Sequence, residues 1–230
     1  MYNRIMNPEK SRNHLPEKKK DAILSQRLLF LIEQDTSLEI LDEIGYGETS
    51  TVFDCTKNKD GVLNALKVSR RSEGIDESEI SVLKRLSDVD GIPKLLQTYK
   101  DKEIVIALLM EKIKGEKFRS YFSLDKKGVS EVFLKIRKLV KEFHSRGLLM
   151  PRDWLKEDNW LIAKNDQPYL LDLGESEHIN KDYEEARAQI EGDIRSFHNL
   201  IFMYVDKINK KDKKKLDSII IEDFFTYFKS

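Results

Sequence analysis

The chain carries the segment Pro151-Arg152-Asp153-Trp154-Leu155-Lys156-Glu157-Asp158-Asn159, and Asp172-Leu173-Gly174 follows Asn159 by 13 residues. An aspartate, a lysine, an asparagine and a second aspartate are side-chain types that phosphoryl transfer uses. One carboxylate orients a hydroxyl nucleophile, an amide and another carboxylate hold Mg²⁺, and a lysine neutralises charge on the moving phosphoryl group. Short apolar runs, Leu148-Leu149-Met150 and Trp160-Leu161-Ile162, flank the segment and predict short strands on either side of it.

A glycine-containing turn lies upstream, between two predicted strands. The strand Leu38-Glu-Ile-Leu-Asp-Glu-Ile44 leads into Gly45-Tyr46-Gly47-Glu48-Thr49-Ser50-Thr51-Val52. Glycines in such a turn let backbone N–H groups close over phosphate oxygens, although an ordinary hairpin is the alternative. Ala65-Leu66-Lys67 then ends an apolar strand. A lysine at that position is costly to bury unless it meets a phosphate or a carboxylate from the next helix.

The balance of secondary structure changes at Lys114-Gly115. Before it, alternating apolar residues predict an antiparallel sheet, with one helix at residues 77–86. After it, helices dominate, and residues 129–143 carry the clearest apolar stripe. We therefore divide the chain into an N-terminal extension (residues 1–36), a sheet-rich part (37–113) and a mostly helical part (114–230).

The two ends of the chain are expected to be helical. Residues 21–35 predict an amphipathic helix, which either docks on the domain or lies on a membrane surface as a weak peripheral contact. Near the C-terminus we expect separate helices at residues 183–191 and 194–205, a basic linker at 207–215 and a last helix at 216–228. The basic linker is predicted to be a solvated surface, with an acidic partner or anionic lipid as the alternative.

The composition narrows the class of protein. The 230 residues include 41 Lys and Arg and 41 Asp and Glu, so the net charge gives no indication of a nucleic-acid partner. The single Cys55 excludes an internal disulfide and fits a reducing compartment. The apolar runs are too short to span a bilayer. We therefore expect a soluble, cytoplasmic protein.

Taken in order, the glycine turn, the strand lysine, the helix carboxylate, the segment around Asp153 and the aspartate of Asp172-Leu173-Gly174 resemble the protein kinase superfamily. The intervals from Gly45 to Lys67 and from Asn159 to Asp172 match those of the family, and the resemblance covers residues 38 to about 205. It implies an α+β, bilobal, protein-kinase-like fold. The N-lobe would hold an antiparallel sheet, and the C-lobe would be reduced and mostly helical.

The resemblance also implies roles for individual residues in binding ATP and Mg²⁺. The predicted ATP contacts are Gly45, Tyr46, Gly47, Ser50, Val52, Ala65, Lys67, Glu79, Met110, Glu111 and Ile113. Within this set, Lys67 would contact the α- and β-phosphates and pair with Glu79, with Glu77 as an alternative. Met110 would be the gatekeeper, and residues 111–113 the hinge that binds adenine.

The predicted catalytic and metal-binding residues lie in the second half of the chain. Asp153 would orient the acceptor hydroxyl, Lys156 would contact the γ-phosphate, and Asn159 and Asp172 would ligate Mg²⁺. Asp193 would brace the catalytic loop. We expect His144 and His198 to be structural.

The sequence departs from the family pattern at several positions. Pro151 replaces the usual histidine, Trp154 adds a residue to the loop, and Ser50 replaces the third glycine. Only 21 residues separate Asp172 from Asp193, which leaves little room for peptide-docking elements. In this shortened region the chain is similar to the small kinase-like proteins of the RIO and lipopolysaccharide-kinase kinds. The resemblance as a whole predicts an ATP-dependent kinase acting on a protein Ser/Thr hydroxyl, with a small-molecule or sugar kinase and a nucleotide-binding pseudokinase scaffold as alternatives.

Overall fold

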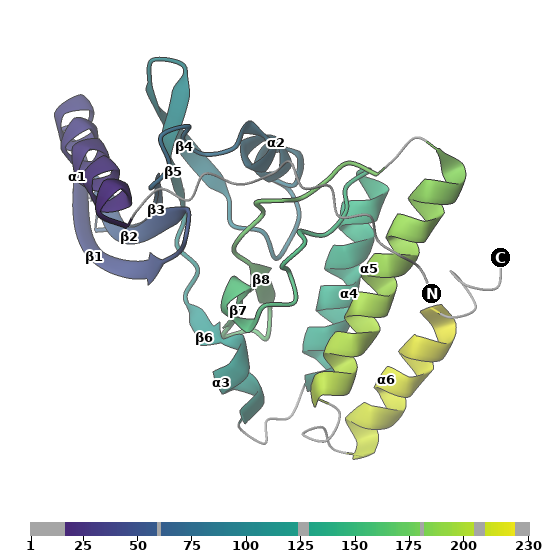
Figure 1. The fold of residues 1–230 in the computed structure, drawn as a ribbon. Coiled ribbons are helices and arrows are strands. Elements are labelled where there is room, and N and C mark those ends of the chain that lie inside the picture. The colour runs from purple at the N-terminus through teal and green to yellow at the C-terminus, as the bar shows by residue number, and fades with distance from the viewer. Residues whose placement is uncertain (1–16, 59–60, 124–128, 180–181, 205–209, 224–230) are drawn as a thin grey trace.

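The computed structural model describes residues 17–58, 61–123, 129–179, 182–204 and 210–223. In Figure 1 the sheet-rich half, with α1 and α2, lies beside a half built mainly from α4, α5 and α6. The chain passes from the first half to the second after β5 (Ile104–Glu111), through residues 112–114. The described residues therefore form the two parts that the sequence predicts, one rich in strands and one mostly helical.

The first half is organised by a five-stranded antiparallel sheet with the order β1-β2-β3-β5-β4. Its other strands are β1 (Leu38–Tyr46), β2 (Ser50–Lys57), β3 (Leu63–Ser69) and β4 (Leu95–Asp101). The register pairs Val52 with Lys67 and Lys67 with Leu108. Ala65, which lies two residues before Lys67 in β3, pairs with Met110. Because side chains alternate along a strand, Lys67, Ala65 and their neighbours share the face that turns toward the second half.

Helix α1 (Glu17–Gln34) covers the opposite face of this sheet (Figure 1). Leu31 is fully buried in a cluster with Leu66 and Val68 of β3. Arg27 donates hydrogen bonds to the carbonyls of Ser69 (2.7 Å) and Ser72 (3.1 Å). Helix α1 therefore docks on the domain, while Leu29 and Ile32 remain exposed on its outer side.

Helix α2 (Glu77–Arg85) follows β3 and has clear local signals at both ends. Asp76 caps its N-terminus by accepting a hydrogen bond from the backbone N–H of Ser78 at 2.8 Å. Acidic residues occupy its first turn and basic residues its last, as the helix dipole favours. Ile80 and Leu83 are buried, so the face that they share with Glu79 turns inward.

The second half contains a three-stranded sheet and the larger apolar core. Its elements are β6 (Gly115–Lys117), α3 (Phe118–Ser123), α4 (Val129–Ser145), the 3₁₀ turn η1 (Glu157–Asn159), β7 (Trp160–Ala163), β8 (Pro168–Leu170), α5 (Tyr183–Tyr204) and α6 (Lys210–Asp223). The predicted apolar stripe of α4 is buried throughout. No helix in the described residues is long and apolar enough to cross a membrane.

Three local predictions for the second half are wrong. Residues 183–204 form one helix, because Gly192 on an exposed face weakens a helix by about 1 kcal/mol without ending it. Lys210 and the residues up to Lys215 belong to α6 and are not a linker. Leu148 forms a single bridge with His178, where a short strand was expected. Residues 224–228 of the last predicted helix lie outside the described residues.

Candidate active site

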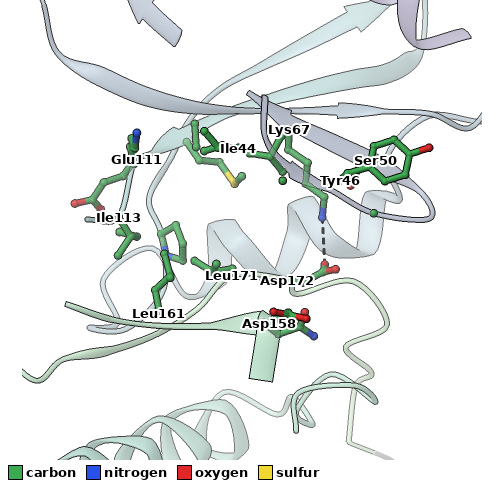
Figure 2. A pocket seen from close by; sticks show the side chains of 18 of the residues that line it. Ile44, Tyr46, Ser50, Lys67, Glu111, Ile113, Asp158, Leu161, Leu171 and Asp172 are labelled. Atoms are coloured by element: carbon green, nitrogen blue, oxygen red, sulfur yellow. Dashed lines mark hydrogen bonds and ion pairs between the residues drawn. The ribbon is translucent and has the colours of Figure 1, made fainter. Parts of the chain in front are cut away.

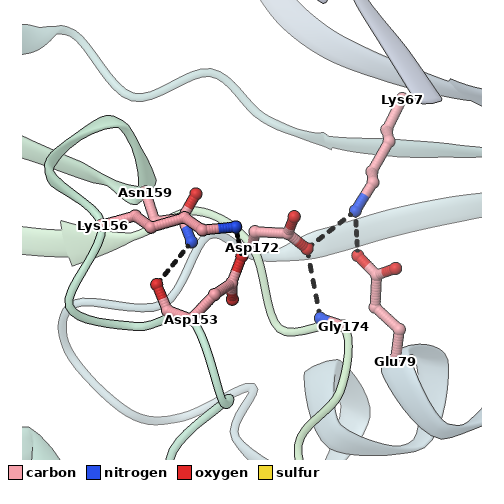
Figure 3. Close-up of polar contacts among 7 residues, drawn as sticks. All are labelled: Lys67, Glu79, Asp153, Lys156, Asn159, Asp172 and Gly174. Atoms are coloured by element: carbon pink, nitrogen blue, oxygen red, sulfur yellow. Dashed lines mark hydrogen bonds and ion pairs between the residues drawn. The ribbon is translucent and has the colours of Figure 1, made fainter. Parts of the chain in front are cut away.

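Lys67 on β3 is the centre of the charged groups. Its Nζ lies 2.5 Å from Glu79 Oε1 and 3.1 Å from Asp172 Oδ1 (Figure 3). Lys67 is only 6% exposed, and Glu79 is equally buried. Burial lowers the pKa of Lys67, but the two carboxylates raise it further, so its pKa lies above the usual value and the ammonium stays charged.

The position of α2 decides which carboxylate meets Lys67. Glu79 lies on the buried face of the helix with Ile80, whereas Glu77 is exposed. Of the two alternatives left by the sequence, Glu79 is therefore the partner of Lys67. Gly174 lies beside the same groups, and its N–H donates to Asp172 Oδ1 at 3.1 Å. Burial raises the pKa of Asp172, but Lys67 and this N–H lower it more, so the net direction is below the usual range.

The glycine turn joins β1 and β2 above this cluster. The N–H of Gly47 donates to the carbonyl of Ser50 at 2.9 Å, which closes the turn. Gly45 pairs with Val52 in the sheet, and Val52 pairs with Lys67, so only β2 lies between the strand that leads into the turn and the strand of the lysine. This arrangement keeps the backbone of the turn close to any group that Lys67 binds.

The segment around Asp153 is a pair of consecutive tight turns. The N–H of Trp154 donates to the carbonyl of Pro151 at 3.0 Å, and the N–H of Lys156 donates to that of Asp153 at 2.9 Å. The extra residue, Trp154, is 3% exposed and packs edge-on against Trp160, whose Nε1 donates to the Trp154 carbonyl at 2.5 Å. The added residue is thus absorbed by the core, and Asp153 and Lys156 remain at the surface of the site.

Asp153 and Lys156 pair with each other at 3.0 Å. The Lys156 side chain is 69% exposed, so this contact is far more open than that of Lys67. Hydrogen bonding to Asp153 and attraction to that carboxylate raise the pKa of Lys156. Asn159 Nδ2 donates to the carbonyl of Asp153 at 3.1 Å, which connects the loop to the residue predicted to bind metal (Figure 3).

Asp193 braces the start of this loop from α5. Its Oδ2 accepts a hydrogen bond from the backbone N–H of Met150 at 3.0 Å and lies 2.9 Å from His144 Nε2. His198, on the same helix, contacts the buried Asp223 of α6. Both histidines therefore make contacts between helices.

A backbone contact joins the two halves of the predicted catalytic set. The N–H of Leu171 donates to the carbonyl of Asn159 at 2.8 Å, so Asp172 follows directly beside the Asp153 loop. Contacts run from Glu79 through Lys67 to Asp172, and from Asn159 to Asp153 and Lys156. Residues that are more than 100 positions apart are thereby brought to one place.

A cavity of about 450 Å³ opens between the two sheets beside this cluster. Figure 2 shows Ile44 and Ile113 on one side of it and Leu161 and Leu171 on the other. Most of the predicted nucleotide and metal residues line it: Gly45, Tyr46, Gly47, Ser50, Val52, Ala65, Lys67, Met110, Glu111, Ile113, Asn159 and Asp172. Asp153, Lys156 and Glu79 lie outside its lining. Glu79 contacts Lys67, the Asp153 carbonyl accepts from Asn159, and Lys156 contacts Asp153.

The sequence reasoning missed several residues that line the cavity. They are Ile44, Pro93, Lys117, Asp158, Leu161 and Leu171. Leu161 and Leu171 had a usable signal, since each is an apolar residue within two positions of a predicted metal ligand. Together with Ile44 and Ile113 they provide apolar walls suited to a flat aromatic ring.

The donor set fits a metal that arrives with a phosphorylated ligand. Asn159 and Asp172 line the same cavity and supply one amide and one carboxylate. Within the described residues, no group of three or more His, Cys, Asp or Glu side chains could hold a metal alone. Mg²⁺ commonly binds through one or two carboxylates together with substrate phosphates, which matches this sparse set.

Comparison with known proteins agrees with the two-part fold and its cavity. Residues 38–194 match the protein kinase domain family. The chain therefore belongs to the protein kinase family.

A solved structure of similar fold is the kinase PK-1 of Cydia pomonella granulovirus, with a TM-score of 0.53 and 16% sequence identity. The match covers 68% of this chain and 60% of the viral chain, so this chain spans less than two thirds of that kinase. At this identity the likeness concerns the fold alone. No curated protein matches the sequence.

Proposed function

We propose that this protein is an active kinase that uses ATP and Mg²⁺ to phosphorylate a hydroxyl acceptor, with a protein Ser/Thr side chain as the first candidate. One observation carries the proposal: Lys67, Asn159 and Asp172 line one cavity although Lys67 is remote from the other two in sequence, and the hydrogen bond from Asn159 to the Asp153 carbonyl joins the Asp153 loop to them. The carboxylates of Glu79 and Asp172 hold Lys67, and Asn159 lies in the same cavity. This set suits a ligand that brings both phosphate and metal.

In this proposal the role of each residue follows from its position in the site. Lys67 binds the α- and β-phosphates while Glu79 keeps its ammonium in place. Asn159 and Asp172 hold Mg²⁺, which when bound neutralises charge on the phosphate oxygens. The apolar walls at Ile44, Leu161 and Leu171 accept the adenine ring.

Asp153 and Lys156 serve the transfer itself. Asp153 accepts the acceptor's hydroxyl proton as the hydroxyl oxygen bonds to the γ-phosphorus and the bond to the β-phosphate oxygen breaks, releasing ADP. Lys156, which is exposed and paired only with Asp153 at 3.0 Å in the described contacts, is free to turn toward the γ-phosphate. Positioning and charge neutralisation supply the catalysis in this scheme.

A small-molecule or sugar hydroxyl is the second candidate acceptor, and the shortened acceptor side favours it. Helix α5 begins at Tyr183, soon after Asp172, and Asp193 on it already braces the catalytic loop. Little chain is left between these points to form a surface for an extended peptide.

Phosphate transfer from [γ-³²P]ATP with Mg²⁺ tests the proposal. Wild-type protein is incubated with Ser/Thr peptide mixtures, sugars and no added acceptor, beside Asp153→Ala and Asp172→Ala. Asp217→Ala on the exposed side of α6 is the matched control. We expect label transfer by the wild type and the control, and its loss in both site variants.

The outcomes separate the candidates. Label on peptides or on the protein itself supports the Ser/Thr assignment, and label on sugars alone supports the small-molecule acceptor. Tight Mg²⁺-ATP binding without transfer to any acceptor would identify a pseudokinase. Equal transfer by wild type, Asp153→Ala and Asp172→Ala would refute the proposed site.

A further inference from the structure

Arg70 connects the glycine turn to helix α1. It follows β3 directly, and its side chain is 1% exposed. Its Nη1 donates to the carbonyl of Gly47 at 2.9 Å, and its Nη2 lies 2.8 Å from Asp21 Oδ1 on α1. Its guanidinium carbon lies 4.0 Å from the centre of the Tyr46 ring. One buried cation therefore contacts the turn twice and the helix once.

The contacts with the turn fix its backbone at two points. Besides the side-chain bond to Gly47, the N–H of Arg70 donates to the carbonyl of Thr49 at 2.8 Å. Gly47 and Glu48 are exposed, so the turn has little apolar packing of its own. Its conformation over the cavity depends on hydrogen bonds, and Arg70 supplies two of them.

The contacts with α1 run in both directions across the interface. Arg70 reaches from the end of β3 to Asp21, while Arg27 reaches from α1 to the carbonyls of Ser69 and Ser72. Helix α1 precedes residues 38–194, which match the kinase family. Arg70, which supports the turn, is thus paired with a helix that lies outside the residues matching the family.

We propose that α1 is part of the nucleotide-binding machinery, with Arg70 as the positioning residue that couples the docking of α1 to the conformation of the glycine turn. The inference rests on the nucleotide binding proposed above. Because coupling between two sites is reciprocal, docked α1 favours nucleotide binding and bound nucleotide favours docked α1.

A second anchor of α1 provides a matched control. Asp35, just after the helix, accepts a hydrogen bond from Tyr99 Oη at 2.9 Å and pairs with Lys57 at 3.2 Å. In the described residues, none of its contacts reaches the glycine turn. Loss of the Asp35 anchor leaves the contacts of Arg27 and Arg70 in place, so α1 should stay docked and nucleotide binding should be unchanged although the fold is weakened.

The test measures binding of a non-hydrolysable ATP analogue with Mg²⁺ by titration calorimetry, for wild type, Arg70→Lys, Asp21→Asn and Asp35→Asn. Arg70→Lys keeps the charge but loses the planar fork, and Asp21→Asn changes a largely exposed side chain, so neither should prevent folding. We expect Kd to rise about 5- to 20-fold for Arg70→Lys and about 3-fold for Asp21→Asn. Asp35→Asn should stay within about 2-fold.

Hydrogen exchange gives a readout that a purely structural role would not move. The analogue should slow amide exchange in residues 17–34 of the wild type and leave the exchange in Arg70→Lys unchanged. Wild-type Kd in Arg70→Lys or in Asp21→Asn would overturn the coupling while leaving nucleotide binding intact. A wild type that binds no analogue would overturn both the coupling and the proposed function.

Discussion

In the proposed site, the side that would bind the nucleotide has a buried lysine, and the side that would bind the acceptor has an exposed one. Lys67 is buried between Glu79 and Asp172, on a sheet backed by α1. Lys156 is mostly exposed and pairs with Asp153, its neighbour in the same loop. A buried lysine fixes a phosphate position in advance, while an exposed lysine can follow a group that moves. In the proposed kinase, the more rigidly held of the two lysines is therefore the one that binds the nucleotide.

The largest expected change in stability follows from Lys67→Met. This substitution leaves the buried Glu79 without its cation, and we expect the free energy of unfolding to fall by about 3 kcal/mol, because breaking a buried ion pair leaves an uncompensated charge. Phosphate transfer should fall below detection. Urea denaturation and the transfer assay measure the two effects.

The double variant Lys67→Met/Glu79→Gln is the control for that prediction. It removes the stranded charge, so most of the lost stability should return while phosphate transfer stays absent. If the single and the double variant were equally stable, the buried charge of Glu79 would not be the cause of the stability lost in Lys67→Met.

Asp35→Asn should have an intermediate and pH-dependent effect on the same half. The Ser37 hydroxyl, together with Tyr99 and Lys57 and against the effect of burial, lowers the pKa of Asp35 from 3.8 to about 2. Since its folded pKa is depressed, its contribution is complete above about pH 4 and is lost as pH falls through about 2. We expect a loss of about 1–2 kcal/mol at neutral pH.

Urea denaturation at several pH values checks this prediction, with wild type and Asp35→Asn compared at each pH. The difference in unfolding free energy between them should shrink as the pH falls from about 4 to about 2. A difference that stays constant over this range would mean that Asp35 stabilises α1 through something other than its charge.

On the acceptor side, Asp153→Asn should separate activity from stability. We expect phosphate transfer to fall by about 100- to 10,000-fold, because the acceptor hydroxyl loses the group that orients it and takes its proton. The free energy of unfolding should change by less than about 0.5 kcal/mol, since the pair with Lys156 is exposed. A large loss of stability would contradict the contrast between the two sides.

The smallest change in stability is expected for Lys156→Met. An exposed ion pair contributes little, so the free energy of unfolding should shift by less than about 0.5 kcal/mol, and added salt should reduce even that shift. Thermal denaturation at low and high salt measures the effect. A shift comparable with that of Lys67→Met would mean that the loop is held by this pair and not by the packing of Trp154.

Much of the nucleotide side could be predicted because its signals are local. The apolar run that ends at Ala65-Leu66-Lys67 predicted a strand, and burial of the lysine at its end required a negative partner. Burial of the α4 stripe also followed from helical spacing. The single helix α5 could not be predicted in this way, because the cost of Gly192 is small and is outweighed by burial of Ile194, Phe197 and Ile201 on one face.

Local sequence patterns could not predict the contacts between segments that are distant in the chain. Glu77 and Glu79 are equivalent in sequence, and only the rotation of α2 against the sheet turns Glu79 toward Lys67. The link from α1 through Arg70 to Gly47 had no sequence signal, because it joins three segments that meet only after folding.

The amino-acid sequence alone determined the order and spacing of the charged residues, the alternation that forms the sheet and the family to which these patterns point. The tertiary structure alone decided that Glu79 and not Glu77 pairs with Lys67, and that Arg70 links α1 to the glycine turn. The physical reason is that periodicity and turn chemistry act between near neighbours, whereas ion pairs and packing depend on which surfaces the folded chain brings within a few ångströms.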